Sequence, residues 1–509
     1  MSNTSNKLIF TNTLILYFRL FITLSISLYT SRVVLDVLGV EDFGLYNVIG
    51  GTVAIFSFFS ASMQSATQRF LMFDLGKQDY LKYNKTFNAN IFLYFFIAIV
   101  IFILSETIGL WYITNKAKIP ADRLELFLFI YHVSIISYCL SIIRIPYSSG
   151  VVAQEKMKFF AYTAIFESIL KLGFVILLIY TSFNKLIYYS LSILITTVLV
   201  NIIYIIFCSY DENKLYKFSS RIDIETMKPI IGFSGWRILG SSSQMIEQSG
   251  IILVINYFFN ATANASYAIA NQVNVAVNNL VFSFQQAYYP QITKRYADNK
   301  TSDLYTLILF SGKISFFLLS FVCIPILLNI EYILTLWLNK TPNYSIDFIR
   351  LIIICSLIDV FSAPLWMLIL STGKIKKYQI FLSIITLSMF LVSWLLVIKG
   401  FDPTVLLFIK IVGAIFILCY RYFLLKYYYK LHIKTYLTKS VLLPFLGFLL
   451  TYALIYSISN SYIGMTKLVL VLIIESIIYP TVFYFSLSTM HKVSVKKIIY
   501  NKLKLTNEK

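Results

Sequence analysis

The sequence predicts an all-α, polytopic membrane protein with about fourteen transmembrane helices. Of its 509 residues, 58% are hydrophobic and 13% are charged, whereas soluble domains average about 45–50% apolar and about 25% charged residues. The apolar residues are gathered into runs of about 20, the length that a helix needs to cross the hydrocarbon core. The polar segments between the runs are too short to form a soluble domain. Binding or transport must therefore take place within the membrane-embedded part.

Each apolar run defines one expected helix. The runs near 229–257 and 265–289 are the least apolar, so these two helices depend most on packing against protein neighbours. The expected spans are roughly 12–35, 43–65, 87–112, 124–148, 159–181, 187–208, 229–257, 265–289, 304–329, 346–370, 379–398, 404–424, 441–459 and 464–488.

Lysine and arginine are concentrated in alternate loops, on the same side as the N-terminus. The positive-inside rule then predicts cytoplasmic N- and C-termini and an even number of spans. Topology also accounts for the net charge of +20, so a nucleic-acid partner is not expected. The expected parts are a six-helix lobe (1–215), a second six-helix lobe (216–430), two additional helices (431–488) and a basic cytoplasmic tail (489–509). The tail's lysines either contact anionic lipid or serve only as a topology signal.

Two similar hairpins organise this arrangement. The first covers 12–69 and is expected to turn at 38–44; the second covers 235–296. A shift of about 221 residues places the helix at 43–65 on the helix at 265–289 and pairs Gln64 with Gln285. Transporters are often built from two such halves around a midplane site. The alternative is a chance alignment of two apolar helices.

Arginines within the spans are candidates for binding an anion. Arg19 and Arg237 lie at similar depths in their helices and have no acidic residue at helical spacing, whereas Lys171 follows Glu167 by four residues and is expected to pair with it. The planar guanidinium suits phosphate oxygens. The alternative for both arginines is a structural contact between the lobes. The cations assigned to substrate binding are Arg19, Arg32, Arg237 and Lys313.

Amide side chains form a stripe on the expected helix at 265–289. Asn271, Asn274, Asn278 and Gln285 recur at helical spacing and therefore share one face. Amides in a hydrocarbon environment are costly unless they are paired. The stripe therefore either binds a polar ligand, for which sugar hydroxyls are suitable, or makes hydrogen bonds between helices. Gln64 joins it as a further candidate.

Three acids lie in the middle of spans: Glu247, Asp359 and Glu475. Such acids are candidates for proton or cation relay. Glu247 and Asp359 are the expected ion-coupling residues, with Glu247 preferred because it shares a helix with Arg237. The alternative for Glu247 is pairing with a buried cation. The cysteines and histidines are scattered, so no disulfide, metal site or cofactor is expected, and no clustered acid–base constellation points to an enzyme.

Three segments carry a resemblance to a known family. They are 31–46 (SRVVLDVLGVEDFGLY), 144–147 (RIPY) and 153–157 (AQEKM). They resemble bacterial polysaccharide flippases, the O-unit (Wzx-type) branch of the multidrug/oligosaccharidyl-lipid/polysaccharide exporter superfamily. The resemblance implies two six-helix lobes in a V around a central cationic cavity, and alternating access. It also implies translocation of an undecaprenyl-diphosphate-linked oligosaccharide for O-antigen (lipopolysaccharide), capsule or exopolysaccharide synthesis.

By this resemblance, Arg19 and Arg237 would meet the diphosphate, while Gln64 and Asn278 would meet sugar. A polysaccharide polymerase and a chain-length regulator are further candidate partners. Two alternatives come from the same superfamily: a cation-coupled multidrug exporter, whose cavity should carry net acid, and a peptidoglycan-precursor flippase. A membrane-embedded polymerase or glycosyltransferase is the alternative of a different class, but the chain lacks the large external loop or metal-binding acidic pair that such enzymes use.

Overall fold

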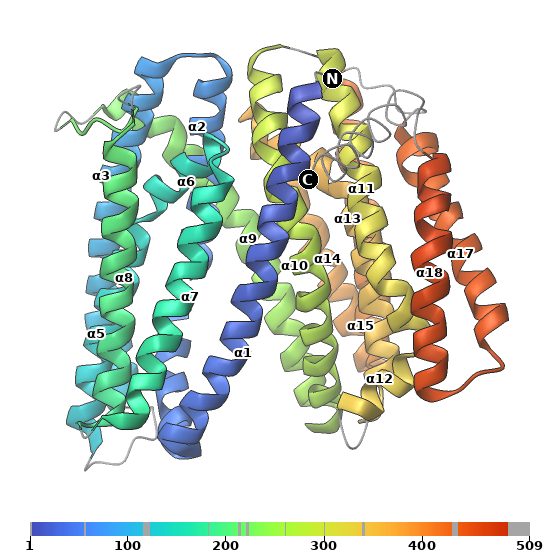
Figure 1. Cartoon of the computed structure of the whole chain (residues 1–509), viewed down its shortest axis with the longest axis horizontal. Helices are drawn as coiled ribbons and strands as arrows, with labels where there is room; N and C mark the ends of the chain where they lie inside the picture. The colour runs from blue at the N-terminus through green and yellow to red at the C-terminus, as the bar shows by residue number, and fades with distance from the viewer. Residues whose placement is uncertain are drawn as a thin grey trace, which may run out of the picture. The chain divides into compact units, whose positions relative to one another are not determined.

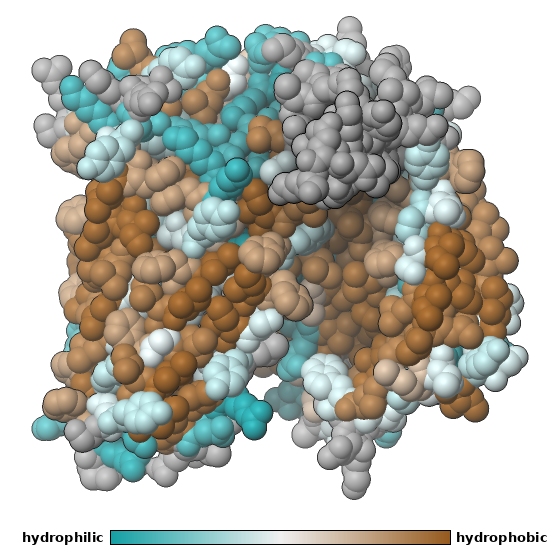
Figure 2. Space-filling view, in the orientation of Figure 1, coloured by the Kyte–Doolittle hydropathy of each residue, from teal (hydrophilic) through white to brown (hydrophobic). Residues whose placement is uncertain are grey.

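The computed structural model describes residues 3–54, 57–115, 123–181, 183–211, 215–219, 223–259, 261–299, 301–337, 342–429 and 436–486. Within these ranges the chain is helical and contains no strand, which confirms the all-α prediction (Figure 1). Twelve described helical segments are long and apolar enough to cross a membrane. Figure 2 shows hydrophobic residues over the middle of the helices, with hydrophilic residues gathered toward their ends. The predicted tail (489–509) lies outside the described residues.

The described residues fall into two compact units, and the boundary between them lies inside α9. The first unit lies within 12–241 and the second within 1–11 and 242–509. The helices up to this boundary are α1 (Asn3–Ala54), α2 (Ser57–Gly76), α3 (Tyr80–Leu104), the π-helical turn η1 (Ser105–Gly109), α4 (Leu110–Asn115), α5 (Leu124–Ile143), α6 (Ile145–Ala153), α7 (Met157–Tyr180), α8 (Lys185–Ser209) and α9 (Ile224–Phe258).

The second unit continues from α9 and is built around α13. About 78% of the apolar window of α13 is buried, the largest share among the described candidate spans, because α10, α11 and α15 all pack against it. Its helices are α10 (Ala261–Ala297), α11 (Thr301–Leu328), α12 (Ile330–Trp337), α13 (Ser345–Thr372), α14 (Lys376–Ile398), α15 (Thr404–Tyr429), the π-helical turn η3 (Leu437–Leu442), α17 (Leu443–Ser459) and α18 (Gly464–Ser486).

The segment 38–44, which was expected to be a turn between two helices, is itself helical. α1 is a helix of 52 residues that continues through this segment to Ala54, and α2 begins at Ser57. Gly39 and Gly44 motivated the turn, but glycine weakens a helix by only about 1 kcal/mol relative to alanine. A helix satisfies its own backbone polar groups, which matters most where water is scarce, so the surrounding apolar residues keep the segment helical.

α10 shows how a polar segment can form a long helix here. It has 37 residues but is not among the twelve candidate spans, because its amides, serines and threonines lower its hydropathy. α10 packs against α11 and α13, and it buries residues such as Tyr267 and Val281 there. Protein neighbours therefore replace lipid along much of its surface, as expected for the less apolar span at 265–289.

Polar residues placed just before apolar runs start several helices. Asp79 accepts a hydrogen bond from the Lys82 amide (2.9 Å) at the start of α3, and Asp223 accepts one from the Thr226 amide (3.1 Å) at the start of α9. Each carboxylate satisfies an amide that lacks an intrahelical partner. These hydrogen bonds lower the pKa of Asp223 below its ordinary value. The helices thus begin where sequence polarity changes.

Candidate functional site

A charged cavity lies within the second unit, between α9, α13, α14 and α15. Its volume is about 260 Å³. Gly250 allows α9 to pack closely against α14, because a Cβ atom there would lie only 2.4 Å from the Phe390 ring. The charged residues that line the cavity are Glu247 from α9, Asp359 from α13, and Lys410 and Arg421 from α15.

The two acids of this cavity face two cations. The Nζ atom of Lys410 lies 4.0 Å from Oε1 of Glu247, and the exposed fractions of these side chains are 31% and 14%. Asp359 lies in electrostatic range of Lys410 and Arg421. Arg421 is itself buried, and its Nε donates to the hydroxyl of Tyr378 (2.9 Å). The cavity thus contains equal numbers of acidic and basic side chains.

The structure brings together the two residues predicted to couple an ion, Glu247 and Asp359, in one cavity. It also supports the alternative stated for Glu247, which is pairing with a buried cation. That cation is Lys410, which is not among the residues predicted from the sequence, although the spacing of basic residues on α15 could have indicated it. Lys410 and Arg421 are eleven residues apart, which is close to three helical turns, so they share a face of α15.

Glu475, the third mid-span acid, lies elsewhere. It is on α18, its exposed fraction is 1%, and its carboxyl oxygens have no hydrogen-bond partner within the described chain. It does not line the charged cavity. The structure therefore separates Glu475 from the other two acids.

The amide stripe on α10 is partly engaged in hydrogen bonds to α13. Asn278 Nδ2 donates to Asn274 Oδ1 (2.7 Å) and to Ser356 Oγ (3.2 Å), and the Ser356 hydroxyl donates to Asn274 Oδ1 (2.8 Å). For Asn274 and Asn278, this favours the interhelical alternative over direct sugar binding. Asn271 and Gln285 are partly exposed and take no part in this network.

Arg19 and Arg237 both belong to the first unit. The guanidinium of Arg19 lies over the Phe160 ring, 4.9 Å from its centroid, and makes no hydrogen bond or ion pair within the described chain. Arg237 donates from Nε to the hydroxyl of Ser65 on α2 (3.3 Å). Gln64, next to Ser65, is partly exposed. Both arginines thus lie in spans and are partly exposed.

The remaining predicted cations have local partners. Arg32 lies 4.0 Å from Asp36 one turn later, and both side chains are mostly exposed. Lys313 is buried and donates to the backbone oxygen of Ser486 (2.8 Å), which ties α11 to the end of α18. The predicted pair of Lys171 with Glu167 is confirmed at 2.7 Å, and Arg144 joins it at 3.1 Å. These contacts give Arg32 and Lys313 structural partners.

Comparisons with known proteins find similarity at the level of fold. No family model and no curated protein matches the chain. An outward-facing multidrug resistance MATE family transporter of the MOP superfamily is similar, with a TM-score of 0.70, 13% identity, and coverage of 84% of this chain and 96% of that chain. A MATE structure in the straight conformation is similar with a TM-score of 0.69 and 14% identity, and the match covers 83% of this chain and 96% of that chain.

A MOP superfamily transporter from Pyrococcus furiosus is also similar, with a TM-score of 0.66, 14% identity, and coverage of 84% of this chain and 96% of that chain. Its description states that reverse polarity of its binding pocket suggests a different function. All three solved structures are transporters, and the chain spans nearly their whole length. The chain therefore has the fold of the multidrug and related transporters of the MOP superfamily.

Proposed function

We propose that this protein is a flippase that moves an undecaprenyl-diphosphate-linked oligosaccharide across the bacterial inner membrane for surface polysaccharide synthesis. Arg19 is the observation that carries the proposal. It lies within a candidate span, and its guanidinium lies over the Phe160 ring and makes no hydrogen bond or ion pair within the described chain. A contact with the face of a ring uses the charge of the guanidinium and does not consume its N–H donors. That geometry suits phosphate oxygens, which accept paired hydrogen bonds from arginine.

Arg237 is the second proposed diphosphate ligand. It is partly exposed in the same unit, and its Nε donates to the Ser65 hydroxyl. Asn271, Gln285 and Gln64 are partly exposed amides, and we assign sugar contact to them. Asn274 and Asn278 support the scaffold through Ser356 instead. In this mechanism the headgroup crosses through the protein while the lipid tail remains in the bilayer.

Glu247 and Asp359 are the proposed coupling residues. Protonation of either acid would weaken its attraction to Lys410 and so change the packing of α15 against α9 and α13. A proton gradient could therefore bias the conformational cycle of alternating access. The predicted orientation, with both termini cytoplasmic, places the positively charged loops on the side where the substrate is made.

A cation-coupled multidrug exporter is the second candidate, favoured by the fold shared with multidrug transporters and by two acids in one membrane cavity. The charge balance of the cavity favours the flippase. An exporter of cationic drugs needs uncompensated acid, whereas Lys410 and Arg421 stand opposite the two acids. A peptidoglycan-precursor flippase would use the same diphosphate chemistry, and genetic complementation distinguishes it.

The test is complementation of a strain that lacks its own polysaccharide flippase but makes the matching sugar. We expect the wild-type chain to restore surface polysaccharide, Arg19→Ala to reduce it at least about tenfold, and Arg19→Lys to restore part of it, since lysine keeps the charge without the planar fork. Lys399→Ala is the control, because Lys399 is an exposed cation at the end of α14.

Three outcomes would contradict the proposal. Failure of the wild-type chain to restore polysaccharide, although it inserts in the membrane, would reject the flippase. Full activity of Arg19→Ala would reject the diphosphate site while leaving the flippase in place. Drug resistance conferred by the wild-type chain, with loss of resistance in Glu247→Gln, would favour the exporter.

A further inference from the structure

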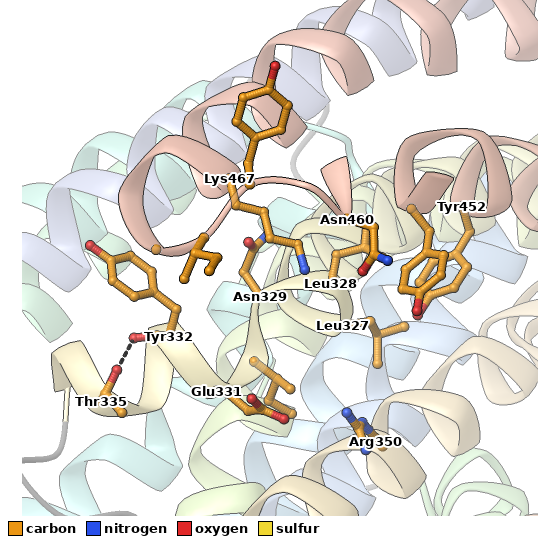
Figure 3. Close-up of a pocket in the computed structure, with 15 residues that line it drawn as sticks. Leu327, Leu328, Asn329, Glu331, Tyr332, Thr335, Arg350, Tyr452, Asn460 and Lys467 are labelled. Atoms are coloured by element: carbon orange, nitrogen blue, oxygen red, sulfur yellow. Dashed lines mark hydrogen bonds between the residues drawn. The ribbon is translucent and has the colours of Figure 1, made fainter. Parts of the chain in front are cut away.

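A second pocket lies in the second unit, at the end of its helices that the positive-inside pattern predicts to be external. Its volume is about 540 Å³, and it shares no lining residue with the charged cavity (Figure 3). It is formed where α11 gives way to α12, beside the first turns of α13 and the turn that joins α17 to α18. The pocket is therefore built from several rigid elements.

Tyrosines, amides and charged side chains dominate the lining. Pockets that bind small polar ligands combine aromatic surface with a few convergent polar groups, in volumes of about 300–1,000 Å³. Figure 3 shows groups from α12, α13 and α18 facing a common space. The tyrosines are Tyr332, Tyr452, Tyr456 and Tyr462, and the amides are Asn329 and Asn460.

Asn329 has an unsatisfied acceptor in the pocket wall. Its exposed fraction is 4%, and its Nδ2 donates to the backbone oxygen of Pro325 (3.1 Å). Its Oδ1 atom has no hydrogen-bond partner within the described chain. Buried amide oxygens are normally paired, so this atom calls for a donor that the described chain does not supply. The atom is closed to solvent, so a hydroxyl group of a bound ligand becomes its donor when the Asn329 amide turns toward the pocket.

The turn between α17 and α18 lies against one of the tyrosine rings. Gly464 has φ = +65°, a conformation that other residues adopt at a cost, and it begins α18. A Cβ atom at this position would lie 3.4 Å from the Tyr332 ring. That distance is ordinary van der Waals contact, so glycine is favoured here by the backbone conformation, and the turn lies against Tyr332 of α12.

The charges of the pocket are mixed. Arg350 lies 4.0 Å from Asp347, with both side chains about half exposed. Lys467 makes no ion pair within the described chain, and Glu331 is exposed on another wall. A purely cationic site would suit a phosphate headgroup. Tyrosine rings, amides and charges of both signs instead suit a ligand with many hydroxyls and apolar C–H faces.

We propose that this pocket binds a saccharide. The inference rests on the proposed function, because it makes the pocket a receiving site for the oligosaccharide portion of the substrate at the predicted external side. Tyrosine rings would contact sugar C–H faces, the Asn329 and Asn460 amides would bind hydroxyls, and Lys467 would bind hydroxyls or an acidic substituent. Release of the glycan from this pocket would then precede its use by enzymes that extend or transfer it.

The experiment is photo-crosslinking in cells of the native producer. p-Benzoylphenylalanine replaces Tyr456, whose exposed fraction is 49%, and in a matched control it replaces Tyr257, another exposed tyrosine of the second unit at the predicted external end. After irradiation, the full-length protein is purified and analysed for periodate-reactive sugar and for added mass. We expect a glycan adduct at position 456 and none above background at position 257.

A second pair of variants tests the polar contacts. Asn460→Ala combined with Lys467→Ala should lower the yield of glycan adduct at position 456 about fivefold, a change typical of losing polar contacts. Both residues are exposed or partly exposed, so expression should be unchanged. Size-exclusion chromatography in detergent checks that each variant is folded.

The outcomes separate the two proposals. A lipid-only adduct or no adduct at position 456, in a variant that still supports polysaccharide export, rejects the saccharide pocket and leaves the flippase standing. A glycan adduct in a chain that fails every complementation test supports the pocket and rejects the flippase. Equal glycan adducts at positions 456 and 257 reject a specific site.

Discussion

The ammonium group of Lys410 lies 4.0 Å from the carboxylate of Glu247, and this contact joins α15 to α9 across the charged cavity. Neither helix reveals the pair by itself, since the two residues are far apart in the chain. Asp359 on α13 lies in electrostatic range of the same lysine. Lys410 therefore lies in electrostatic range of both predicted coupling acids, and Arg421 is a second cation near Asp359.

Removing Lys410 should destabilise the protein more than removing Glu247. Lys410→Met leaves two carboxylates facing one remaining cation, whereas Glu247→Gln leaves Lys410 with Asp359. We expect losses of about 1–3 kcal/mol for the single variants and a smaller loss in the double variant than their sum. Thermal unfolding of the wild type, the two single variants and the double variant in detergent micelles measures these losses. Strict additivity would show that the two side chains do not interact.

Asp74 should make stability depend on pH. The exposed fraction of Asp74 is 1%, and this burial raises the pKa of Asp74 to about 6. A hydrogen bond from the Thr86 hydroxyl (2.7 Å) and the charges of Lys82 and Arg69 oppose the increase in the pKa. Because the folded state holds the proton more tightly than the unfolded state, this contribution favours folding below about pH 4 and is lost as pH rises through about 6.

The corresponding measurement compares melting temperatures of the wild type and Asp74→Asn between pH 4.5 and 7.5. The wild type should lose a few degrees relative to the variant across this range, since asparagine keeps the shape without titrating. Identical pH profiles would mean that Asp74 does not titrate in this window. Asp402→Asn is the control, because Asp402 is exposed and lies far along the chain, just before α15.

Ser356→Ala should weaken the contact between α10 and α13. The substitution removes the donor to Asn274 Oδ1 and an acceptor of Asn278 Nδ2, and hydrogen bonds between membrane helices contribute about 0.6–2 kcal/mol. Ser388→Ala is a matched control, since the Ser388 hydroxyl bonds only to the Ile385 carbonyl of its own helix. Hydrogen exchange of α10 should increase in the first variant alone; equal exchange in both would argue against the network.

Two glycines should respond in opposite ways to alanine. At Gly150 a Cβ atom would lie 2.6 Å from the Tyr216 ring and 3.0 Å from the Tyr83 hydroxyl, and these two hydroxyls share a hydrogen bond of 3.2 Å. Gly150→Ala should therefore cost about 1–3 kcal/mol through overpacking.

Gly173 provides the comparison, because its Cβ would meet nothing within 4 Å in the middle of α7. Gly173→Ala should be neutral or stabilising by up to about 1 kcal/mol, since alanine is the better helix former. Thermal unfolding of both variants checks the pair. A stable Gly150→Ala protein would mean that Tyr216 can move aside without cost.

How much could be predicted from the sequence differs between the fold and the site. Most spans agree with the predicted ranges to within a few residues, for example 187–208 against α8 and 379–398 against α14. The length of an apolar run and its polar ends are local properties, so they can be read along the chain. The segment 38–44 is helical although a turn was expected, because glycines alone do not end a helix whose neighbours are apolar.

The sequence by itself determined the membrane-spanning helices, the asymmetry of basic residues between loops, and the inventory of arginines, acids and amides placed inside spans. The tertiary structure decided which of these groups meet. Ser356 makes hydrogen bonds to Asn274 and Asn278. Lys410 lies near Glu247, and the guanidinium of Arg19 lies over the Phe160 ring. The reason is physical: hydrophobicity places a helix in the membrane, but the shapes of side chains on distant helices determine which polar faces pack together.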